Sequence, residues 1–272
     1  MVLPAYVGAL DRKRQRETAL ITGASSGIGL DLAHLMAPDF DLIITARNQA
    51  ELEKIAKELQ TTHGNYVHVI PADLAQPEVP QQLFAEIERR GLPVDILINN
   101  AGFGSYGAFA ESDPRVSLDM IEVNIAALTA LTRAALPGMI ERKHGKIMNV
   151  ASTAGFQPGP LMAVYYATKA YVIMFSEAIA NELEDSGVTV TCLCPGATAT
   201  NFAGRANMEE SRLFKLGAMK SRDVAIAGYK GMMAGKGLVI PGLLNKTVAM
   251  SVRFSPRKLV TAISRSLQEK AK

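Results

Sequence analysis

Short apolar runs alternate along the chain with segments of helical periodicity, beginning at residue 18. The runs are rich in Ile, Val and Leu and are apolar throughout, which is typical of strands that are covered on both faces in a parallel sheet. The pattern predicts seven strands, over Thr18–Thr22, Asp41–Ala46, Tyr66–Pro71, Asp95–Ile98, Lys146–Val150, Val188–Cys194 and Leu238–Ile240.

Two long helices are predicted in the second half of the pattern. The first begins at the cap Ser112–Pro114 and runs toward Glu141, and we expect Pro137 to kink or end it. The second runs over Ala163–Glu184 and ends near Gly187. Shorter helices are predicted between the first strands, over Leu30–Met36, Gln49–Gln60 and Gln81–Arg90.

Strands that alternate with helices predict an α/β fold. We expect a doubly wound, seven-stranded, mostly parallel sheet with helices on both faces, the Rossmann arrangement, because strand-helix-strand crossovers are right-handed. Ligands then bind outside the carboxyl ends of the strands. The length of 272 residues and the hydrophobic share of 48% suit a single domain over residues 1–272.

The charge balance excludes several partners. A net charge of +3 is small and evenly spread, so we expect no nucleic-acid binding. The densest basic run, Arg12 to Arg16, is interpreted as part of a solvated N-terminal arm over residues 1–16. No apolar stretch reaches about 18 residues, and Met1–Leu10 lacks the features of a signal peptide, so we expect no membrane span and a cytoplasmic location.

The two cysteines and four histidines offer no metal site. Cys192 and Cys194 would share one face of a strand, too far apart for a good disulfide, and we interpret them as small core residues. The histidines are scattered and pair with neither cysteines nor carboxylates at the spacing of metal ligands.

A glycine-rich turn follows the first strand, in the segment Thr22-Gly-Ala-Ser-Ser-Gly-Ile-Gly29. Gly23, Gly27 and Gly29 allow the backbone to turn tightly and to approach a pyrophosphate, which then sits at the N-terminus of the next helix. Glycine-rich turns are common, but this one lies between a predicted strand and a predicted helix.

The end of the second strand bears on the choice of nucleotide. A site for NAD usually places an Asp or Glu there to bind the ribose 2′-hydroxyl. This chain has Ala46 and Arg47 instead, and a guanidinium forms charge-assisted bonds with a 2′-phosphate. We therefore expect the protein to bind NADP(H). The alternative interpretation is that Arg47 is an ordinary surface arginine at the end of a strand.

Tyr165 and Lys169 lie four residues apart in the second long helix. This spacing places them on the same helix face, whereas Tyr166 lies off the face of Lys169. A cation beside a phenol lowers the phenol pKa and makes it a better proton donor or acceptor near neutral pH. Because such a pair also arises by chance, the prediction depends on Ser152, which follows the fifth predicted strand and could bind a carbonyl oxygen.

Over residues 18–200 the chain resembles the short-chain dehydrogenases/reductases of the single-domain, NADP-preferring type. Seven motifs carry the resemblance in the order that the family requires. They are the glycine turn Thr22–Gly29, Asp73-Leu74, Asn99-Asn-Ala-Gly102, Asn124, Ser152, Tyr165-x-x-x-Lys169 and Pro195-Gly-Ala-Thr-Ala-Thr200.

The resemblance implies a catalytic tetrad of Asn124, Ser152, Tyr165 and Lys169. Tyr165 would donate its proton to the substrate carbonyl, and Ser152 would bind the same oxygen as negative charge develops. Lys169 would lower the Tyr165 pKa and bind the nicotinamide ribose. Asn124 would hold a water that links Lys169 to solvent.

The resemblance also implies the residues that bind the nucleotide. Ser25 would lie near the adenosine phosphate, Asp73 and Leu74 would border the adenine, and Asn100 would contact the ribose. The segment from Pro195 to Thr200 would flank the nicotinamide. The full implied set is Gly23, Ser25, Ser26, Gly27, Ile28, Gly29, Arg47, Asp73, Leu74, Asn100, Ala101, Gly102, Tyr165, Lys169, Pro195, Gly196, Thr198 and Thr200.

The substrate is less constrained by the sequence. The family places a flexible segment over the substrate, here residues 198–222, and the segments 103–109 and 156–162 would form other walls. These segments are largely apolar and lack a cluster of Arg or Lys, so we expect an apolar or aromatic ketone or aldehyde. The alternatives are a 3-oxoacyl thioester reductase, an epimerase or dehydratase of nucleotide sugars, and a non-catalytic NADP(H) sensor.

Residues 246–270 form a predicted helical extension beyond the last strand. Leu259, Val260, Ile263 and Leu267 recur at helical spacing beside several basic residues. We expect this helix to pack on the domain or on a neighbouring subunit, and contact with a membrane surface is the alternative. The resemblance implies a homodimer or homotetramer, formed through the helices that follow the fourth and fifth strands.

Overall fold

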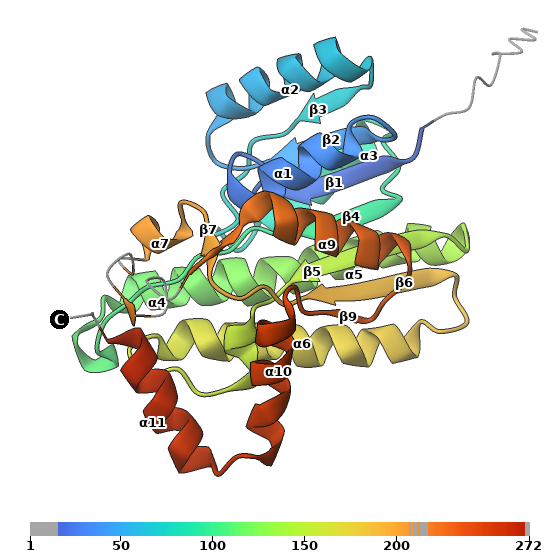
Figure 1. Cartoon of the computed structure of the whole chain (residues 1–272). Coiled ribbons are helices and arrows are strands. Elements are labelled where there is room, and N and C mark those ends of the chain that lie inside the picture. The colour runs from blue at the N-terminus through green and yellow to red at the C-terminus, as the bar shows by residue number, and fades with distance from the viewer. Residues whose placement is uncertain (1–15, 207, 209–210, 213–216, 270–272) are drawn as a thin grey trace, which may run out of the picture.

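The computed structural model describes residues 16–206, 208, 211–212 and 217–269 (Figure 1). The N-terminal arm predicted over residues 1–16 lies outside these residues except for Arg16. So do parts of the predicted substrate segment, among them Leu213, Phe214 and Leu216.

Seven parallel strands form the central sheet, in the order β3-β2-β1-β4-β5-β6-β9. The order reverses between β1 and β4, which creates a crevice at the carboxyl ends of these strands. The predicted doubly wound fold is confirmed. The strands are β1 Thr18–Thr22, β2 Asp41–Thr45, β3 Val67–Val69, β4 Ile96–Asn99, β5 Gly145–Val150, β6 Val188–Leu193 and β9 Leu238–Val239.

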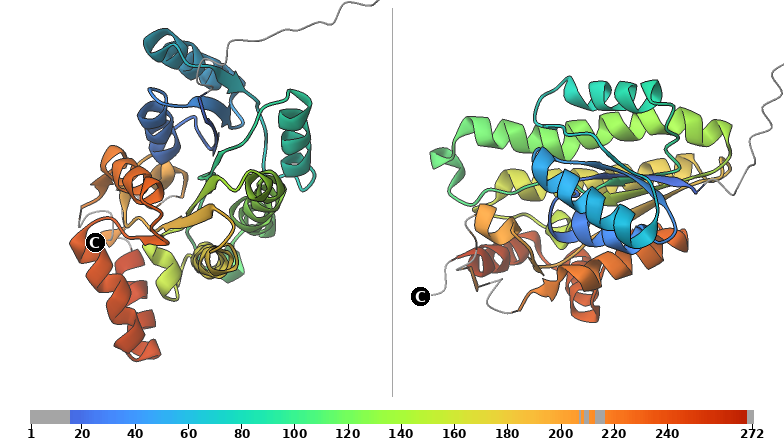
Figure 2. Two further views of the ribbon diagram at one scale, coloured as in Figure 1. Left: turned by 90° about the vertical axis from the view of Figure 1, so that its right-hand side faces the viewer. Right: turned by 90° about the horizontal axis from the view of Figure 1, so that it is seen from above.

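Helices cover both faces of the sheet, as the end-on view of Figure 2 shows. On one face α1, α2 and α9 pack against alternate strand residues such as Ile44 and Ile98. On the other face α3, α5 and α6 pack against their neighbours Ile43 and Leu97. Both sides of the strands are therefore buried, which explains their continuously apolar sequences. These helices are α1 Gly27–Met36, α2 Gln49–His63, α3 Val79–Arg89, α5 Leu128–Glu141, α6 Ala163–Glu182 and α9 Ser221–Met233.

One long helix is continuous from Pro114 to Glu141. It consists of α4 (Pro114–Ile121), the π-helical segment η2 (Glu122–Ala127) and α5. Pro137 lies inside α5 and does not end it, and the helix continues to Glu141 as predicted. Packing of the α5 face on the sheet keeps the helix intact after the proline removes one backbone hydrogen bond. By length and composition this helix is apolar enough to cross a membrane, and 39% of its most apolar window is buried inside the fold.

The remaining elements lie around the crevice. The pair β7 (Thr198–Ala199) and β8 (Met219–Lys220) forms a small parallel sheet. The extension forms α10 and α11, which run as a hairpin below the sheet in Figure 1. Helix α10 spans Leu243–Ser251 and helix α11 spans Arg257–Gln268, with the short turn η4 (Val252–Phe254) between them. The other short helical segments are η1 (Phe109–Glu111), η3 (Thr153–Phe156) and α7 (Phe202–Arg205).

Helix α11 packs on the domain through one face. Val260, Ser264 and Gln268, spaced four residues apart, are buried, whereas Leu259 and Ile263 remain about half exposed. The expected packing on the domain is therefore present, and of the four apolar positions that suggested it only Val260 is buried, together with the polar residues Ser264 and Gln268. This packing brings the end of α11 to the crevice described next.

Candidate active site

A cavity of about 1020 Å³ lies at the carboxyl ends of β1, β2, β4, β5 and β6. Of the residues that the resemblance implies for nucleotide binding, all except Gly29 lie in the wall of this cavity. Ser152, Tyr165 and Lys169 also lie in its wall. Asn124 is the only member of the implied tetrad that does not line this cavity. One cavity therefore joins the predicted nucleotide site and the predicted chemical site.

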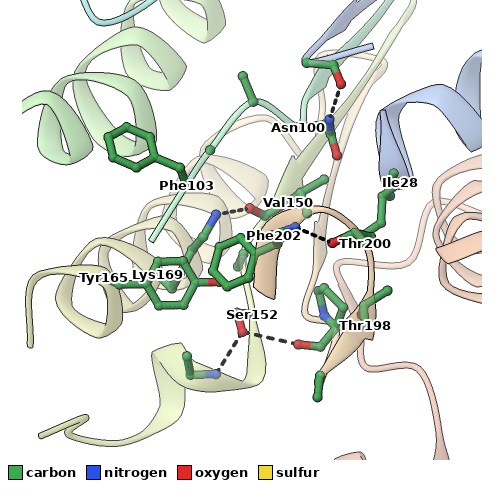
Figure 3. A pocket seen from close by; sticks show the side chains of 18 of the residues that line it. Ile28, Asn100, Phe103, Val150, Ser152, Tyr165, Lys169, Thr198, Thr200 and Phe202 are labelled. Atoms are coloured by element: carbon green, nitrogen blue, oxygen red, sulfur yellow. Dashed lines mark hydrogen bonds between the residues drawn. The ribbon is translucent and has the colours of Figure 1, made fainter. Parts of the chain in front are cut away.

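The glycine turn between β1 and α1 is held by Asn100, which follows β4. Asn100 Nδ2 donates to Thr22 O over 2.9 Å and to Gly23 O over 3.3 Å (Figure 3). Gly23 has a φ of 67°, and a Cβ atom on Gly29 would lie 2.4 Å from Gly23 O and from Asn100 Nδ2. Both positions thus require glycine, one for backbone conformation and the other for close approach.

Thr22 is a functional residue that the motif reading did not single out. Its hydroxyl accepts hydrogen bonds from the backbone N–H of Asn100 and of Ala101, over 3.0 and 2.9 Å. The hydroxyl thus ties the loop after β4 to the end of β1. A threonine directly before the first glycine of the turn is the signal that could have revealed this role.

The N-terminus of α1 is open toward the cavity. Ser26 precedes the helix in an extended conformation, and its side chain makes no capping hydrogen bond. The amide groups of the first turn are therefore left without a side-chain partner, and the helix dipole places positive potential there. This is the donor set that a pyrophosphate requires.

The side of the cavity nearest β2 carries the residues expected around the adenosine. Arg47 is exposed at the end of β2, and Asn48 caps α2 by accepting from Glu51 N over 3.2 Å. Asp73 Oδ1 accepts from Ala75 N over 3.3 Å, which shapes the loop after β3. No carboxylate occupies position 46 or 47, so the approach to Arg47 is free for a phosphate group.

Ser152, Tyr165 and Lys169 meet at the end of β5 (Figure 3). All three are at least nine-tenths buried. Lys169 Nζ donates to Val150 O over 2.8 Å and lies 5.8 Å from the centre of the Tyr165 ring. Ser152 Oγ donates to Pro195 O over 3.3 Å and accepts from Ala154 N over 3.1 Å. The predicted spacing of Tyr165 and Lys169 therefore does place them on one face of α6.

Burial moves the pKa values of this pair in opposite directions. The pKa of Lys169 is lowered to about 8, chiefly because the buried ammonium loses its hydration. Burial also raises the pKa of Tyr165 above its ordinary value, although a hydrogen bond with Ser152 opposes the rise. The expected lowering of the Tyr165 pKa is therefore not found, because desolvation of the buried phenolate dominates.

Asn124 lies in the π-helical segment η2, whose geometry often marks a functional position. Its Oδ1 accepts from Phe103 N over 3.1 Å, and its Nδ2 donates to Phe103 O and to Thr168 Oγ1, each over 3.0 Å. The side chain thus fixes the loop after β4 against α6. Its implied role in holding a water beside Lys169 stays a prediction.

The segment after β6 closes the cavity over the N-terminus of α1. Thr198 Oγ1 donates to Gly196 O over 2.9 Å, and Thr200 Oγ1 accepts from Phe202 N over 3.1 Å. A Cβ atom on Gly27 would lie 3.0 Å from the methyl group of Thr200. The loop and the glycine turn therefore approach each other as closely as a glycine allows.

The wall next to Tyr165 is apolar. The ring of Phe202 lies 5.2 Å from the ring of Tyr165, between centres. A Cβ atom on Gly104 would lie 2.8 Å from Phe202 and 3.1 Å from Met162. Five of the apolar residues expected in the pocket line the cavity, namely Phe103, Met162, Phe202, Met208 and Met219. Phe109 and Phe156, which were also expected there, do not line it.

Two groups of wall residues were not predicted. Helix α10 contributes Leu243, Leu244 and Val248, and α11 contributes Ser264, Leu267 and Gln268. Tyr166, set aside because it lies off the face of Lys169, also lines the cavity and is bonded by Gln268 Nε2. The four-residue spacing of Val260, Ser264 and Gln268 is the sequence pattern from which the buried face of α11 could have been predicted.

Among the residues that the structure describes, no group of three or more His, Cys, Asp or Glu side chains could hold a metal ion. Cys192 and Cys194 are buried and free, with their Sγ atoms 3.6 Å apart. Their interpretation as core residues without a disulfide is confirmed.

A family model for short chain dehydrogenases matches residues 17–211. The chain is 36% identical over 211 residues to a putative ketoacyl reductase of Streptomyces coelicolor, covering 76% of this chain and 80% of that protein.

Two solved structures are also similar to this one. A short-chain dehydrogenase from Sphingobium yanoikuyae in complex with NADPH has a TM-score of 0.79 and 32% identity, covering 88% of this chain and 93% of that chain. A bulky-bulky ketone specific alcohol dehydrogenase from Comamonas testosteroni has a TM-score of 0.74 and 28% identity, covering 89% and 95%. The family model spans most of the chain, and the solved relatives share its whole fold. The chain therefore belongs to the short-chain dehydrogenase family and is an oxidoreductase.

Proposed function

We propose that the protein reduces a neutral carbonyl compound to an alcohol with NADPH, in a reaction that can also run in reverse. The observation that carries this proposal is the meeting of Ser152, Tyr165 and Lys169 in the cavity that also contains the glycine turn. A proton donor and a nucleotide site in one enclosed space are what carbonyl reduction requires.

The residues around the cavity fit NADP(H). The open N-terminus of α1 would bind the pyrophosphate, Arg47 the 2′-phosphate, and Asp73 and Leu74 the adenine. Lys169 would bind the nicotinamide ribose. The bound cofactor supplies the hydride. The NADPH complex of the Sphingobium relative supports this choice of nucleotide.

Tyr165 is the proton donor in this proposal. Because burial raises its pKa, the phenol keeps its proton at neutral pH and is ready to give it to a carbonyl oxygen. Ser152 shares a hydrogen bond with Tyr165 and would stabilise the negative charge that develops on that oxygen. Lys169, whose pKa remains above neutrality, would carry a positive charge that stabilises the resulting phenolate.

We infer an apolar or aromatic ketone or aldehyde as substrate. The wall formed by Phe103, Met162, Phe202 and the α10 residues offers apolar contacts and no cation for a carboxylate. The Comamonas relative, described as specific for bulky-bulky ketones, supports this class. The Streptomyces relative supports the alternative, a 3-oxoacyl thioester.

A screen of NADPH oxidation tests the proposal. Aldehydes, aliphatic and aromatic ketones, ketosteroids and acetoacetyl thioesters would be compared with short charged keto acids. We expect turnover of neutral ketones, and clear preference for the charged acids would contradict the substrate class. Tyr165→Phe should lose turnover by about a hundredfold or more while still binding NADPH, because only the proton donor is removed.

Tyr171→Phe is the matched control on the same helix, since Tyr171 is partly exposed and bonds Thr129 outside the cavity. Unchanged activity in Tyr165→Phe would contradict the mechanism. NADPH binding without turnover of any carbonyl would favour the sensor. Product formation without net NADPH consumption would favour an epimerase or a dehydratase.

A cytoplasmic location stays a prediction.

A further inference from the structure

Three polar side chains form a buried group on the wall built by α6 and α11. They are Tyr166, Ser264 and Gln268, which we call the α6–α11 polar cluster. Tyr166 is 6% exposed, Ser264 2% and Gln268 1%. All three line the same cavity as Ser152 and Tyr165.

The hydrogen bonds within the α6–α11 polar cluster are incomplete. Gln268 Nε2 donates to Tyr166 Oη. Gln268 Oε1 has no hydrogen-bond partner among the residues that the structure describes, and Ser264 Oγ has none beyond its interaction with the Tyr166 hydroxyl, which opposes the rise of the Tyr166 pKa. If the amide is turned over, Oε1 accepts from Tyr166 and an N–H group is left free instead. In either orientation one buried polar group of Gln268, a residue that lines the cavity, has no partner.

Burial of an unpaired polar group lowers the stability of a protein, so such groups usually have partners. Met162, Leu267 and Val248, which line the same cavity, are apolar and cannot supply a partner. A partner from the ligand would remove this deficit. Polar atoms that face an otherwise apolar wall are also what orients a ligand in such a site.

The charge around the cluster selects the chemistry of that partner. The cavity has four charged lining residues, Arg47, Asp73, Asp119 and Lys169, among the described parts of the chain. None belongs to α10 or α11, and Asp119 is already paired with Arg115. An ionised ligand group would therefore be unpaired beside the cluster. A hydroxyl fits best, because it can both donate to Gln268 Oε1 and accept from an N–H group.

We propose that the α6–α11 polar cluster binds a hydroxyl group of the substrate, so that the preferred substrates are apolar hydroxyketones. The carbonyl meets Ser152 and Tyr165, and the hydroxyl meets Gln268 and Ser264. Tyr166 connects the two sites, since its ring packs edge-on against the ring of Tyr165 with 6.1 Å between centres. This inference rests on the proposed carbonyl reduction, and it adds which ketones the enzyme would prefer.

Matched pairs of ketones test the proposal. The probes are cyclohexanones, decalones and ketosteroids, each with and without a hydroxyl on the part remote from the carbonyl. The series varies the distance between the two groups. In the best-fitting pair, wild-type protein should prefer the hydroxylated member by about tenfold in kcat/KM, mainly through KM, because one hydrogen bond to a buried group has that effect.

In Gln268→Met, which keeps the length of the side chain, the ratio between the two members should fall to about one. Ser264→Ala should lower the ratio partly. Ser266→Ala is the matched control, because Ser266 is exposed and bonds Arg212 on another face of α11. The thermal shift produced by the hydroxylated and plain product alcohols gives a readout without turnover, and it should follow the same order.

The outcomes separate the two proposals. If no ketone is turned over, the proposed function fails. If ketones are turned over but wild-type protein shows no hydroxyl preference in any pair, the cluster holds water only and the inference is wrong. A preference that survives in Gln268→Met also overturns it. A melting temperature of Gln268→Met equal to that of the wild type shows that the loss is not caused by unfolding.

Discussion

Lys169 is a buried cation whose only recorded hydrogen bond within the described structure is to Val150 O. Its pKa of about 8 lies below the ordinary value of 10.5, which means that folding disfavours the charged form. In the proposed mechanism the same charge stabilises the Tyr165 phenolate. Function and stability are therefore opposed at this residue.

The pH dependence of stability should reveal this opposition. Between about pH 8 and pH 10.5 the unfolded chain binds the Lys169 proton and the folded chain does not, so the free energy of unfolding rises with pH. Below pH 8 this contribution is constant and unfavourable. We expect the stability of the wild type relative to Lys169→Met to rise by about 3 kcal/mol across the window, measured by urea unfolding at several pH values.

The comparison uses the difference between the two proteins because Tyr165 and Cys194, whose pKa values are raised, lower the stability of both at high pH. A difference that does not change with pH would contradict the assigned Lys169 pKa.

Arg47 should decide the preference between nucleotides. In Arg47→Asp a carboxylate replaces the cation at the end of β2, where it would repel a 2′-phosphate and accept from a 2′-hydroxyl. We expect NADPH to bind about a hundredfold more weakly and NADH to bind better, measured as equilibrium dissociation constants. Arg89→Asp is a control, because Arg89 is exposed on α3 and pairs with Glu86. A variant that still prefers NADPH would show that other residues select the phosphate.

At the scale of elements, the glycine turn and the loop after β4 act as one unit. Asn100 and Thr22 connect them, and a side chain on Gly29 would enter this connection. We expect Gly29→Ala to destabilise the protein by about 1–3 kcal/mol and to weaken NADPH binding, because the turn must move to admit a methyl group. Urea unfolding and nucleotide titration would measure the two effects.

Gly237→Ala is the matched control for this substitution. Gly237 has an ordinary φ, and a Cβ atom there would meet no neighbour within 4 Å. The control should change stability little and leave NADPH binding intact. Equal losses in both variants would mean that the close approach at Gly29 is not the cause.

The elements that could be predicted from the sequence are those with a strong local pattern. Every strand of the large sheet was found, with ends displaced by a few residues at most, because continuous apolar runs are unambiguous in a two-sided sheet. The first long helix ends at Glu141 as predicted, and Pro137 does not interrupt it because tertiary packing outweighs the local effect of the proline. Helix α9 was not predicted, since its alternation of Ala, Gly and Met gives a weak pattern.

The residues of the candidate site also divide into those that have a local sequence pattern and those that have none. The residues of the glycine turn, Ser152, Tyr165 and Lys169 could be found because they lie at fixed spacings at strand ends. The walls from α10 and α11 could not, because a contact between Gln268 and Tyr166 spans 102 positions and leaves no local pattern. The pKa of Tyr165 could not be predicted from the sequence either, since it depends on how deeply the fold buries the phenol.

At the scale of the whole molecule, α4 and α6 share an apolar outer surface. Leu118 is 63% exposed, Ile121 40% and Met174 57%, and α4 contacts α6. These are helices that follow the fourth and fifth strands, where the family resemblance implies a subunit contact. We expect Leu118→Glu combined with Met174→Glu to dissociate an oligomer, because the buried charges would be unpaired.

Light scattering would give the mass of wild type and variant in solution. Phe109→Glu is the control, because Phe109 is an equally exposed apolar residue on η1 outside this surface. A monomeric wild type, or an oligomer that survives the double substitution, would contradict the assignment.

The closing of the cavity by α11 has a consequence for how the protein is made. A ribosome synthesises Arg257–Gln268 after every other helix and strand of the described fold, and domains begin to fold as they emerge. The segments that carry the glycine turn and Tyr165 are therefore made before the segment that carries Gln268. A chain shortened ahead of Arg257 is expected to keep the segments proposed to bind the nucleotide and to lose the contact of Gln268 with Tyr166, so that synthesis adds this part of the cavity wall after the rest.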